Sequence, residues 1–146
     1  MTATYYDATQ VFSRNYGSER LYKRSYCNSL LYTEGLMDLQ TTLDAFWVID
    51  NMVSYMPKIL QAYKEHEYTF FVVEIALNQK QEGYMEVYTE DYVEGEYDEH
   101  ISIVKQDISF IDLPTNPDEE ITTYRFFLEL SSIEPEIYTL LLPSEH

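Results

Sequence analysis

The hydrophobic pattern of this 146-residue chain changes its period near residue 66. Before that point, Leu36, Leu39 and Leu43 recur at the spacing of one helical face, and Phe46 continues the pattern. From residue 69 to residue 77, the side chains alternate between two faces, which is typical of a β-strand. Helices followed by strands predict an α+β fold, with N-terminal helices packed on one face of a roughly five-stranded antiparallel sheet.

The helical half contains signals for where its helices begin and end. Asp44 is of a residue type that caps helix N-termini, which predicts a helix over residues 45–55, and Pro57 then ends this helix or opens the next turn. Residues 59–64 fit a further short helix. Residues 18–32 are ambiguous, with a helix slightly favoured.

Five strands are expected in the second half, separated by turns that contain glycine or proline. They are predicted at residues 69–77, 84–91, 100–111, 121–130 and 136–142. A chain of this length fits one domain. Residues 1–146 are therefore predicted to form a single domain, in which residues 1–66 are mainly helical and residues 67–146 form mainly a β meander.

Charge is distributed unevenly between these halves. The chain carries a formal net charge of −17. Residues 1–66 hold seven acidic and six basic side chains, whereas residues 67–146 hold 19 acidic and three basic ones. This excess disfavours direct binding to a nucleic acid or to an anionic membrane. The partner that the charge predicts is a basic protein surface.

Tyrosine accounts for 15 residues, and several tyrosines alternate with acids along the strand at residues 84–91. Together with the acidic turn at residues 94–99, they predict a partner-binding surface, because carboxylates pair with arginines and tyrosine rings offer rigid contact area. The residues assigned to this surface are Glu82, Glu86, Tyr88, Glu90, Asp91, Tyr92, Glu94, Glu96, Tyr97, Asp98 and Glu99.

This pattern favours an acidic protein-binding module or inhibitor that occupies a basic, nucleic-acid-binding surface of another protein. If a phage or mobile element encodes the chain, such a nucleic-acid mimic would be an anti-defence protein, an anti-CRISPR candidate that inhibits a host nuclease complex. One alternative is a small housekeeping domain whose acids only keep it soluble. Another is a homo-oligomer that packs its tyrosine-bearing face against a copy of itself.

Motifs for catalysis or cofactor binding are missing from the sequence. The four glycines are too scattered for a phosphate-binding loop, and no serine lies in a nucleophile elbow. His66 and His100 are flanked by acids but lack the spacing of a metal site, and such clusters on turns are usually solvated. We therefore expect no enzyme activity, no cofactor and no metal.

The single cysteine and the lack of long apolar segments bear on the compartment. Cys27 is the only cysteine, so an intrachain disulfide is excluded, and a buried or incidental thiol is expected. No stretch reaches the roughly 18 apolar residues that a membrane helix needs, and residues 1–7 lack the pattern of a secretory signal. These features predict a cytoplasmic protein.

Four segments carry a resemblance to a known family. Residues 30–35 read LLYTEG, residues 45–50 read AFWVID, residues 108–114 read ISFIDLP and residues 140–146 read LLLPSEH. With these motifs in this order, the sequence resembles an uncharacterised bacterial domain-of-unknown-function family over residues 28–146. The resemblance implies no activity, substrate or site residue.

Two of these segments also have expected structural roles, in packing the core and in docking the C-terminal residues. Phe46 and Trp47 form an aromatic pair that is expected to pack in the core, because each ring buries a large apolar area. Pro143, Glu145 and His146 are expected to dock the C-terminal residues onto the helices.

Overall fold

The computed structural model describes residues 3–17, 20–92, 98–132, 134 and 136–146, and at residues 91, 92, 98 and 99 it describes the backbone alone. The helices are α1 (Tyr5–Arg14), α2 (Glu34–Leu43), α3 (Trp47–His66) and the 3-10 helix η1 (Pro143–Glu145). The strands are β1 (Leu21–Tyr22), β2 (Leu30–Thr33), β3 (Phe70–Asn78), β4 (Gly83–Tyr92), β5 (Asp98–Ile108), β6 (Ile121–Leu130) and β7 (Tyr138–Leu141). No helix in the described ranges is long and apolar enough to span a membrane.

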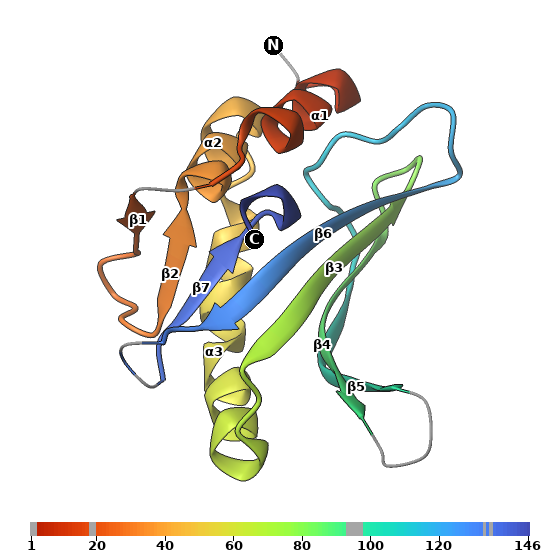
Figure 1. The fold of residues 1–146 in the computed structure, drawn as a ribbon. Helices are drawn as coiled ribbons and strands as arrows, with labels where there is room; N and C mark the ends of the chain where they lie inside the picture. The colour runs from red at the N-terminus through yellow and green to blue at the C-terminus, as the bar shows by residue number, and fades with distance from the viewer. Residues whose placement is uncertain (1–2, 18–19, 93–97, 133, 135) are drawn as a thin grey trace.

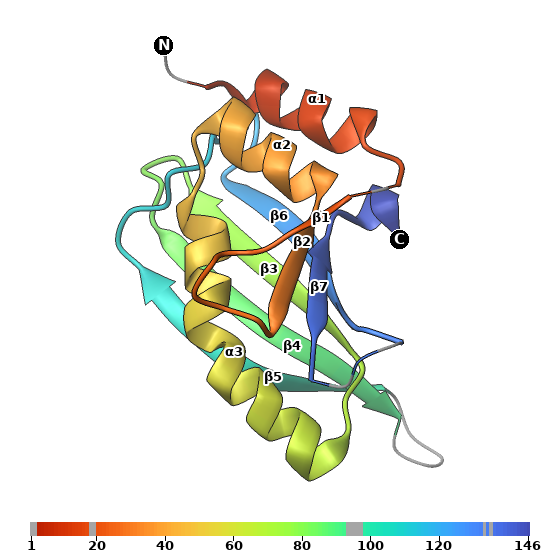
Figure 2. The ribbon, with the colours of Figure 1, turned by 90° about the vertical axis from the view of Figure 1, so that its left-hand side faces the viewer.

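All these strands belong to one sheet, in the order β1-β2-β7-β6-β3-β4-β5. Strands β3 to β7 pair with one another in antiparallel fashion. Helix α3 covers one side of the sheet and lies behind the strands in Figure 1 and in front of them in Figure 2. The predicted α+β class is confirmed.

The sheet differs from the prediction in its number of strands and in one pairing. Residues 18–32, for which a helix was slightly favoured, contain β1 and most of β2, and β2 runs parallel to β7. The roughly five-stranded antiparallel sheet is therefore wrong in detail, because the described sheet is mixed and has seven strands. The physical reason is that β2 is a four-residue apolar run, whose period does not separate a strand from a helix.

The core lies between the sheet and the helices. Along β3, the alternation buries Phe71, Val73, Ile75 and Leu77 on the face that α3 covers. Their neighbours in this core come from β4 (Met85, Val87), β6 (Phe126, Leu128) and α3 (Ile49, Met52, Met56, Ile59), all of which are buried. The period-2 pattern that predicted the strands thus also identifies the side chains that hold the helices to the sheet.

The helices correct three sequence predictions, made for Asp44, Phe46 and Pro57. Asp44 does not begin a helix: it ends α2 in the left-handed conformation, with φ of 56°. α3 starts at Trp47, so Phe46 is exposed, while Trp47 packs against the core as predicted. Pro57 lies inside α3 without ending it, although an interior proline costs about 3 kcal/mol. The buried side chains before and after Pro57 stabilise the continuous helix.

The C-terminal residues dock onto the start of α2, as the sequence predicted. The carboxylate of Glu145 accepts hydrogen bonds from the Thr33 hydroxyl (2.6 Å), the Gly35 amide (3.1 Å) and the Leu142 amide (3.0 Å). A carboxylate at a helix N-terminus also interacts favourably with the helix dipole. One side chain of η1 therefore connects β2, α2 and the end of β7.

A second carboxylate connects the first two helices. Asp38 on α2 accepts hydrogen bonds from Arg14 (Nε, 2.6 Å) and Asn15 (3.0 Å), and its other oxygen accepts one from Thr42 (2.8 Å). Partial burial alone would raise the pKa of Asp38, but these hydrogen bonds outweigh it and lower the pKa below 3.8. The ionised form of Asp38 is therefore the form that fixes α1 to α2.

This pKa shift predicts a loss of stability in acid. A carboxyl whose pKa is lowered by folding adds stability above its unfolded pKa, and this stability is lost as the pH falls through the lower, folded value. We expect Asp38→Asn to lower the urea midpoint at neutral pH and to make that midpoint less dependent on pH below about 4. Glu90→Gln, at an exposed acid without an ion pair in the described structure, is the control and should retain the wild-type pH profile. Equal acid sensitivity of Asp38→Asn and the wild type would contradict this prediction.

Candidate protein-binding surface

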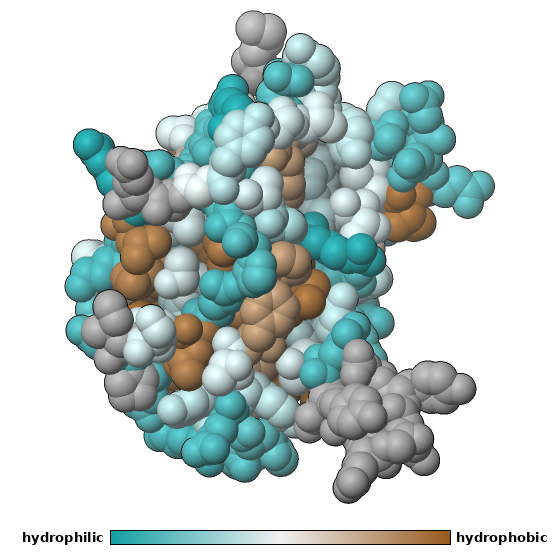
Figure 3. Space-filling view, viewed as in Figure 1, coloured by the Kyte–Doolittle hydropathy of each residue, from teal (hydrophilic) through white to brown (hydrophobic). Residues whose placement is uncertain are grey.

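No α-helix among the described residues covers the side of the sheet opposite α3, and we call this side the open face (Figure 1). By strand alternation it carries Phe70, Val72 and Glu74 of β3, Tyr84, Glu86 and Tyr88 of β4, and Arg125, Phe127 and Glu129 of β6. Figure 3 views this face, where apolar and polar side chains adjoin. His146 reaches onto it from η1, with its ring 5.7 Å from Phe70 and 5.3 Å from Phe127.

The acids of the open face are paired. Glu74 binds Arg125 at 3.0 Å, Glu129 lies 2.6 Å from His146, and Glu86 lies 3.1 Å from His100 on β5. Glu74 therefore has a cationic partner, and Glu86 and Glu129 have histidine partners, so these three carboxylates do not form one free acidic surface.

Glu86 departs most clearly from the sequence prediction. Its side chain was expected in an exposed acidic row, but the residue is only 6% exposed. Its burial opposes ionisation, while hydrogen bonds from Ser102 and His100 more than offset this and lower the pKa of Glu86. The prediction that Glu86 is a freely exposed contact residue is wrong. Strand β4 lies inside the sheet, and residues of the neighbouring strand β5 cover the Glu86 carboxylate.

The two tyrosines beside Glu86 also have partners within the face. The Tyr84 hydroxyl donates a hydrogen bond to Glu74 (2.8 Å), and Lys105 lies over the Tyr84 ring at 4.5 Å. Burial, followed by this hydrogen bond, raises the pKa of Tyr84 to about 12. Tyr88, a predicted contact residue, is half-buried and stacks on His100 at 4.1 Å. Both rings stabilise the sheet in addition to any role at its surface.

Of the other predicted contact residues, those that the structure describes lie at the two ends of β4 and β5. Glu82 is exposed in the β3–β4 turn, and Glu90 is exposed near the opposite end of β4. The backbones of Asp91, Tyr92, Asp98 and Glu99 continue the two strands into their hairpin, and Glu94, Glu96 and Tyr97 lie outside the described residues. The structure thus separates Glu82 from Glu90 by the length of β4.

Near Glu82 the structure brings together acids that the sequence analysis did not assign to a site. Six exposed carboxylates lie on the β3–β4 turn, the end of β5 and the β5–β6 loop: Glu82, Asp107, Asp112, Asp118, Glu119 and Glu120. We call this group the acidic end. The turn and the loop lie at the same end of the sheet in Figure 1, and Lys80 is the basic side chain among the residues of that turn. None of the six has an ion pair within the described part of the chain.

Two glutamines of the turn hold the β5–β6 loop in place. Gln79 donates hydrogen bonds to the carbonyls of Asn116 (2.6 Å) and Glu119. Gln81 donates to the carbonyls of Ile111 and Leu113, both at 3.1 Å. The loop backbone that carries the acids is therefore fixed by side chains, although it contains no regular secondary structure between β5 and β6.

Two large apolar side chains flank the acids of this loop. Phe110 follows β5 and is 62% exposed, and Ile121 begins β6 and is 52% exposed. Apolar side chains surrounded by polar ones are typical of the centre and rim of a protein–protein interface. Only the spacing of acids and apolar residues over residues 110–121 could have signalled this arrangement in the sequence.

A comparison of the sequence with models of known protein families gives a match. A family model matches residues 7–146, which is nearly the entire chain. The chain belongs to DUF6876, a family of unknown function. The resemblance noted for residues 28–146 is thereby confirmed and extends to α1. Neither a curated protein nor a solved structure matches the chain.

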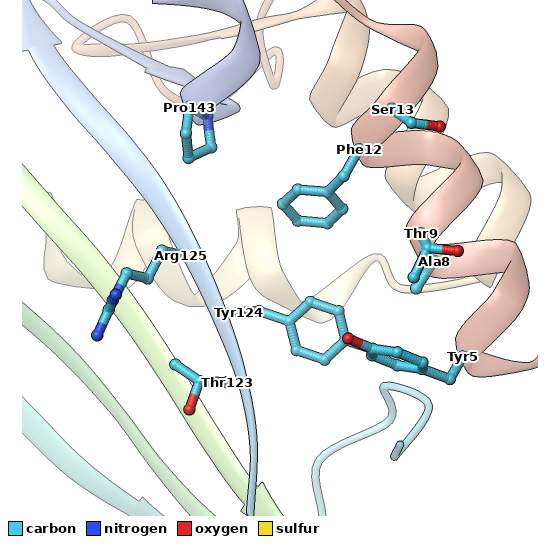
Figure 4. A pocket seen from close by; sticks show the side chains of 9 residues that line it. All are labelled: Tyr5, Ala8, Thr9, Phe12, Ser13, Thr123, Tyr124, Arg125 and Pro143. Atoms are coloured by element: carbon cyan, nitrogen blue, oxygen red, sulfur yellow. The ribbon is translucent and has the colours of Figure 1, made fainter. Parts of the chain in front are cut away.

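The DUF6876 chain also has a groove between α1 and β6, with a volume of about 540 Å³ (Figure 4). Its aromatic wall is formed by Tyr5, Phe12 and Tyr124. The Tyr124 hydroxyl donates a hydrogen bond to the Pro114 carbonyl at 2.6 Å. Arg125, at its edge, points away from Phe12 and is bound to Glu74. No group of three potential metal ligands occurs among the described residues of this DUF6876 protein. Its groove offers apolar contacts and hydroxyls, while the acidic end offers charge.

Proposed function

We propose that this protein is an acidic protein-binding module that occupies a basic surface of a partner protein, including a surface that binds nucleic acid. The observation that carries the proposal is the acidic end, where six exposed carboxylates have no ion pair in the described residues and four of them lie on a loop fixed by Gln79 and Gln81. Carboxylates form strong, charge-assisted hydrogen bonds with arginine and lysine.

The fixed shape of the loop supports binding. A flexible acidic segment would lose conformational entropy when it bound, whereas a loop held by hydrogen bonds to a neighbouring turn has already lost most of it. The charge itself speeds association with a basic partner and repels acidic ones. A second copy of this chain is therefore a poor partner for the acidic end, because its own acids would face like charges.

Phe110 and Ile121 favour binding over a surface that only keeps the protein soluble. Exposure of large apolar side chains lowers solubility, so a purely solubilising loop gains nothing from them. At an interface, the same side chains supply the buried contact area that exposed ion pairs do not.

Capture at two ionic strengths tests this proposal. The tagged chain is used to capture proteins from a lysate of its native source at about 0.05 M and about 0.5 M salt, since screening shortens the range of charge interactions severalfold over that interval. A specific partner with a basic surface, recovered at low salt and lost at high salt, is the expected result. Recovery that does not change with salt would refute an interaction led by the acidic end.

Replacing Phe110 by alanine is expected to weaken that interaction about tenfold, because exposed aromatic side chains commonly act as anchors at interfaces. Tyr16→Ala is the matched control, since Tyr16 is 79% exposed and follows α1, far along the chain from the acidic end. Titration calorimetry with the captured partner measures both variants. Equal weakening by Phe110→Ala and Tyr16→Ala would show that Phe110 is not an anchor.

A further inference from the structure

Strand β5 forms one edge of the sheet. Among the described residues it pairs with β4 alone, and it runs for 11 residues from Asp98 to Ile108. An edge strand directs alternate backbone amides and carbonyls away from the sheet, where they remain available to another extended chain. The opposite edge offers much less, because β1 is only two residues long.

A groove of about 520 Å³ lies between this edge and α3. One wall is formed by α3 from Pro57 to His66, and the other by Ile101, Ser102 and Ile103 of β5. The helical wall is about 14 Å long at the usual rise per residue, which corresponds to about four residues of an extended chain. The groove therefore has the length of a short strand lying along β5.

A β-bulge shapes the apolar floor of this groove. Val87 is aligned with Val104 and Tyr88 with Ser102, which leaves Ile103 as the extra residue of β5. Ile101 and Ile103 are half-buried, and with Ala62 of α3 they line the groove. Apolar side chains at alternate positions of an incoming strand would pack on these three residues.

We propose that β5 accepts a short extended segment of a partner protein as an additional strand, seated between the sheet edge and α3. Backbone hydrogen bonds to β5 provide the attachment, and the groove selects apolar side chains at alternate positions. Basic residues flank the segment. The basic character of the flanking residues rests on the proposed function. Within the groove the opposite charges of Lys58 and Glu65 cancel, so the attraction for a cationic segment comes from the net charge of −17 of the whole chain.

A segment of a different protein fits this edge better than a second copy of the chain. The bulge at Ile103 and the exposed Lys105 are features that disfavour pairing between two long edge strands. Two copies would also bring together two net charges of −17. A segment of about four residues spans only the part of β5 that faces α3. It does not reach Lys105, and it meets the bulge only at Ile103, whose side chain lines the groove.

The probe is a phage-displayed library of random peptides of about eight residues, selected on the complete chain. We expect the selected peptides to carry β-branched apolar residues at alternate positions. Binding of the synthetic peptide should change the amide NMR signals of β5 and of the second half of α3. Gln61→Trp, which fills the groove from an exposed position on α3, should weaken binding about tenfold or more. Ser54→Trp, exposed on the same helix but outside the groove lining, should retain it.

Three results would overturn the proposal: no selected alternation, equal binding to Gln61→Trp, or NMR changes confined to the open face or the acidic end. Sedimentation that reveals a dimer lost in Gln61→Trp would instead assign the edge to a second copy. Peptides with neutral flanks separate this proposal from the proposed function. If they bind as well as peptides with lysine flanks, strand addition holds and the basic character of the segment is wrong.

Discussion

Replacing Gly83 by alanine is expected to lower the free energy of unfolding by about 3 kcal/mol or more, because the new methyl group has no space. A Cβ atom at this position would lie 1.7 Å from the carbonyl oxygen of Ala76 and 2.9 Å from the Cα of Leu77. Both obstacles are backbone atoms of β3, which cannot rotate away as a side chain does. Gly83 is aligned with Leu77, so relief of the clash requires β3 and β4 to separate where their pairing begins after the turn.

Gly17 provides the matched control for this substitution. No atom lies within 4 Å of a Cβ built there, so Gly17→Ala should change the free energy of unfolding by less than about 0.5 kcal/mol. Urea unfolding followed by circular dichroism measures both variants. Similar midpoints for the Gly83 and Gly17 variants would mean that the β3–β4 pairing tolerates a side chain, and would contradict the close approach of these strands.

Neutralising the β5–β6 loop is expected to have the largest effect on partner binding. The variant carries Asp112→Asn, Asp118→Asn, Glu119→Gln and Glu120→Gln. These carboxylates are exposed and accept no hydrogen bond within the described residues, so their neutralisation should leave folding intact. Each exposed ion pair contributes up to about 1 kcal/mol. The loss of four such carboxylates should weaken the binding of the captured partner at least about tenfold and reduce the salt dependence of that binding.

The control for this variant removes the same amount of charge from the other end of the molecule. Glu67, Glu90, Glu134 and Glu136 are exposed after α3, near the far end of β4 and in the β6–β7 connection, and all four are replaced by glutamine. If net charge alone drives association, the two quadruple variants should bind the partner equally. A specific acidic end requires that only the loop variant loses affinity, as measured by titration calorimetry at low salt.

Much of the fold was predictable, because apolar periodicity reports which side chains face the core. The alternation through Phe71, Val73 and Ile75 identified β3 correctly as a strand. Asp44 was predicted to cap the start of a helix but caps the end of α2, because aspartate also adopts the left-handed conformation that ends a helix. Pro57 misled for a different reason, since packing on both sides of it outweighs a local preference.

The candidate site was less predictable, because exposure depends on contacts between strands that no local pattern specifies. Glu86 and Glu90 occupy equivalent positions in the alternation, yet Glu86 is buried and Glu90 is exposed. The difference arises from Ser102 and His100 on β5, whose alignment depends on the bulge. Likewise, the acids of residues 112–120 form a fixed surface only because Gln79 and Gln81 reach them from another turn. Sequence indicates how much charge is present, whereas tertiary pairing determines which charges remain free.

The parallel pairing of β2 with β7 also affects when the protein can acquire its structure. During translation, Leu30 emerges long before Tyr138, the residue with which it is aligned. Until residues 138–145 have left the ribosome, β2 has only the two-residue β1 beside it, and the start of α2 lacks its carboxylate. Contacts between such distant parts of a chain form slowly, and unpaired apolar strands aggregate. The N-terminal part of the fold therefore cannot be completed before residues 138–145 have emerged, because β2 and the start of α2 both depend on them.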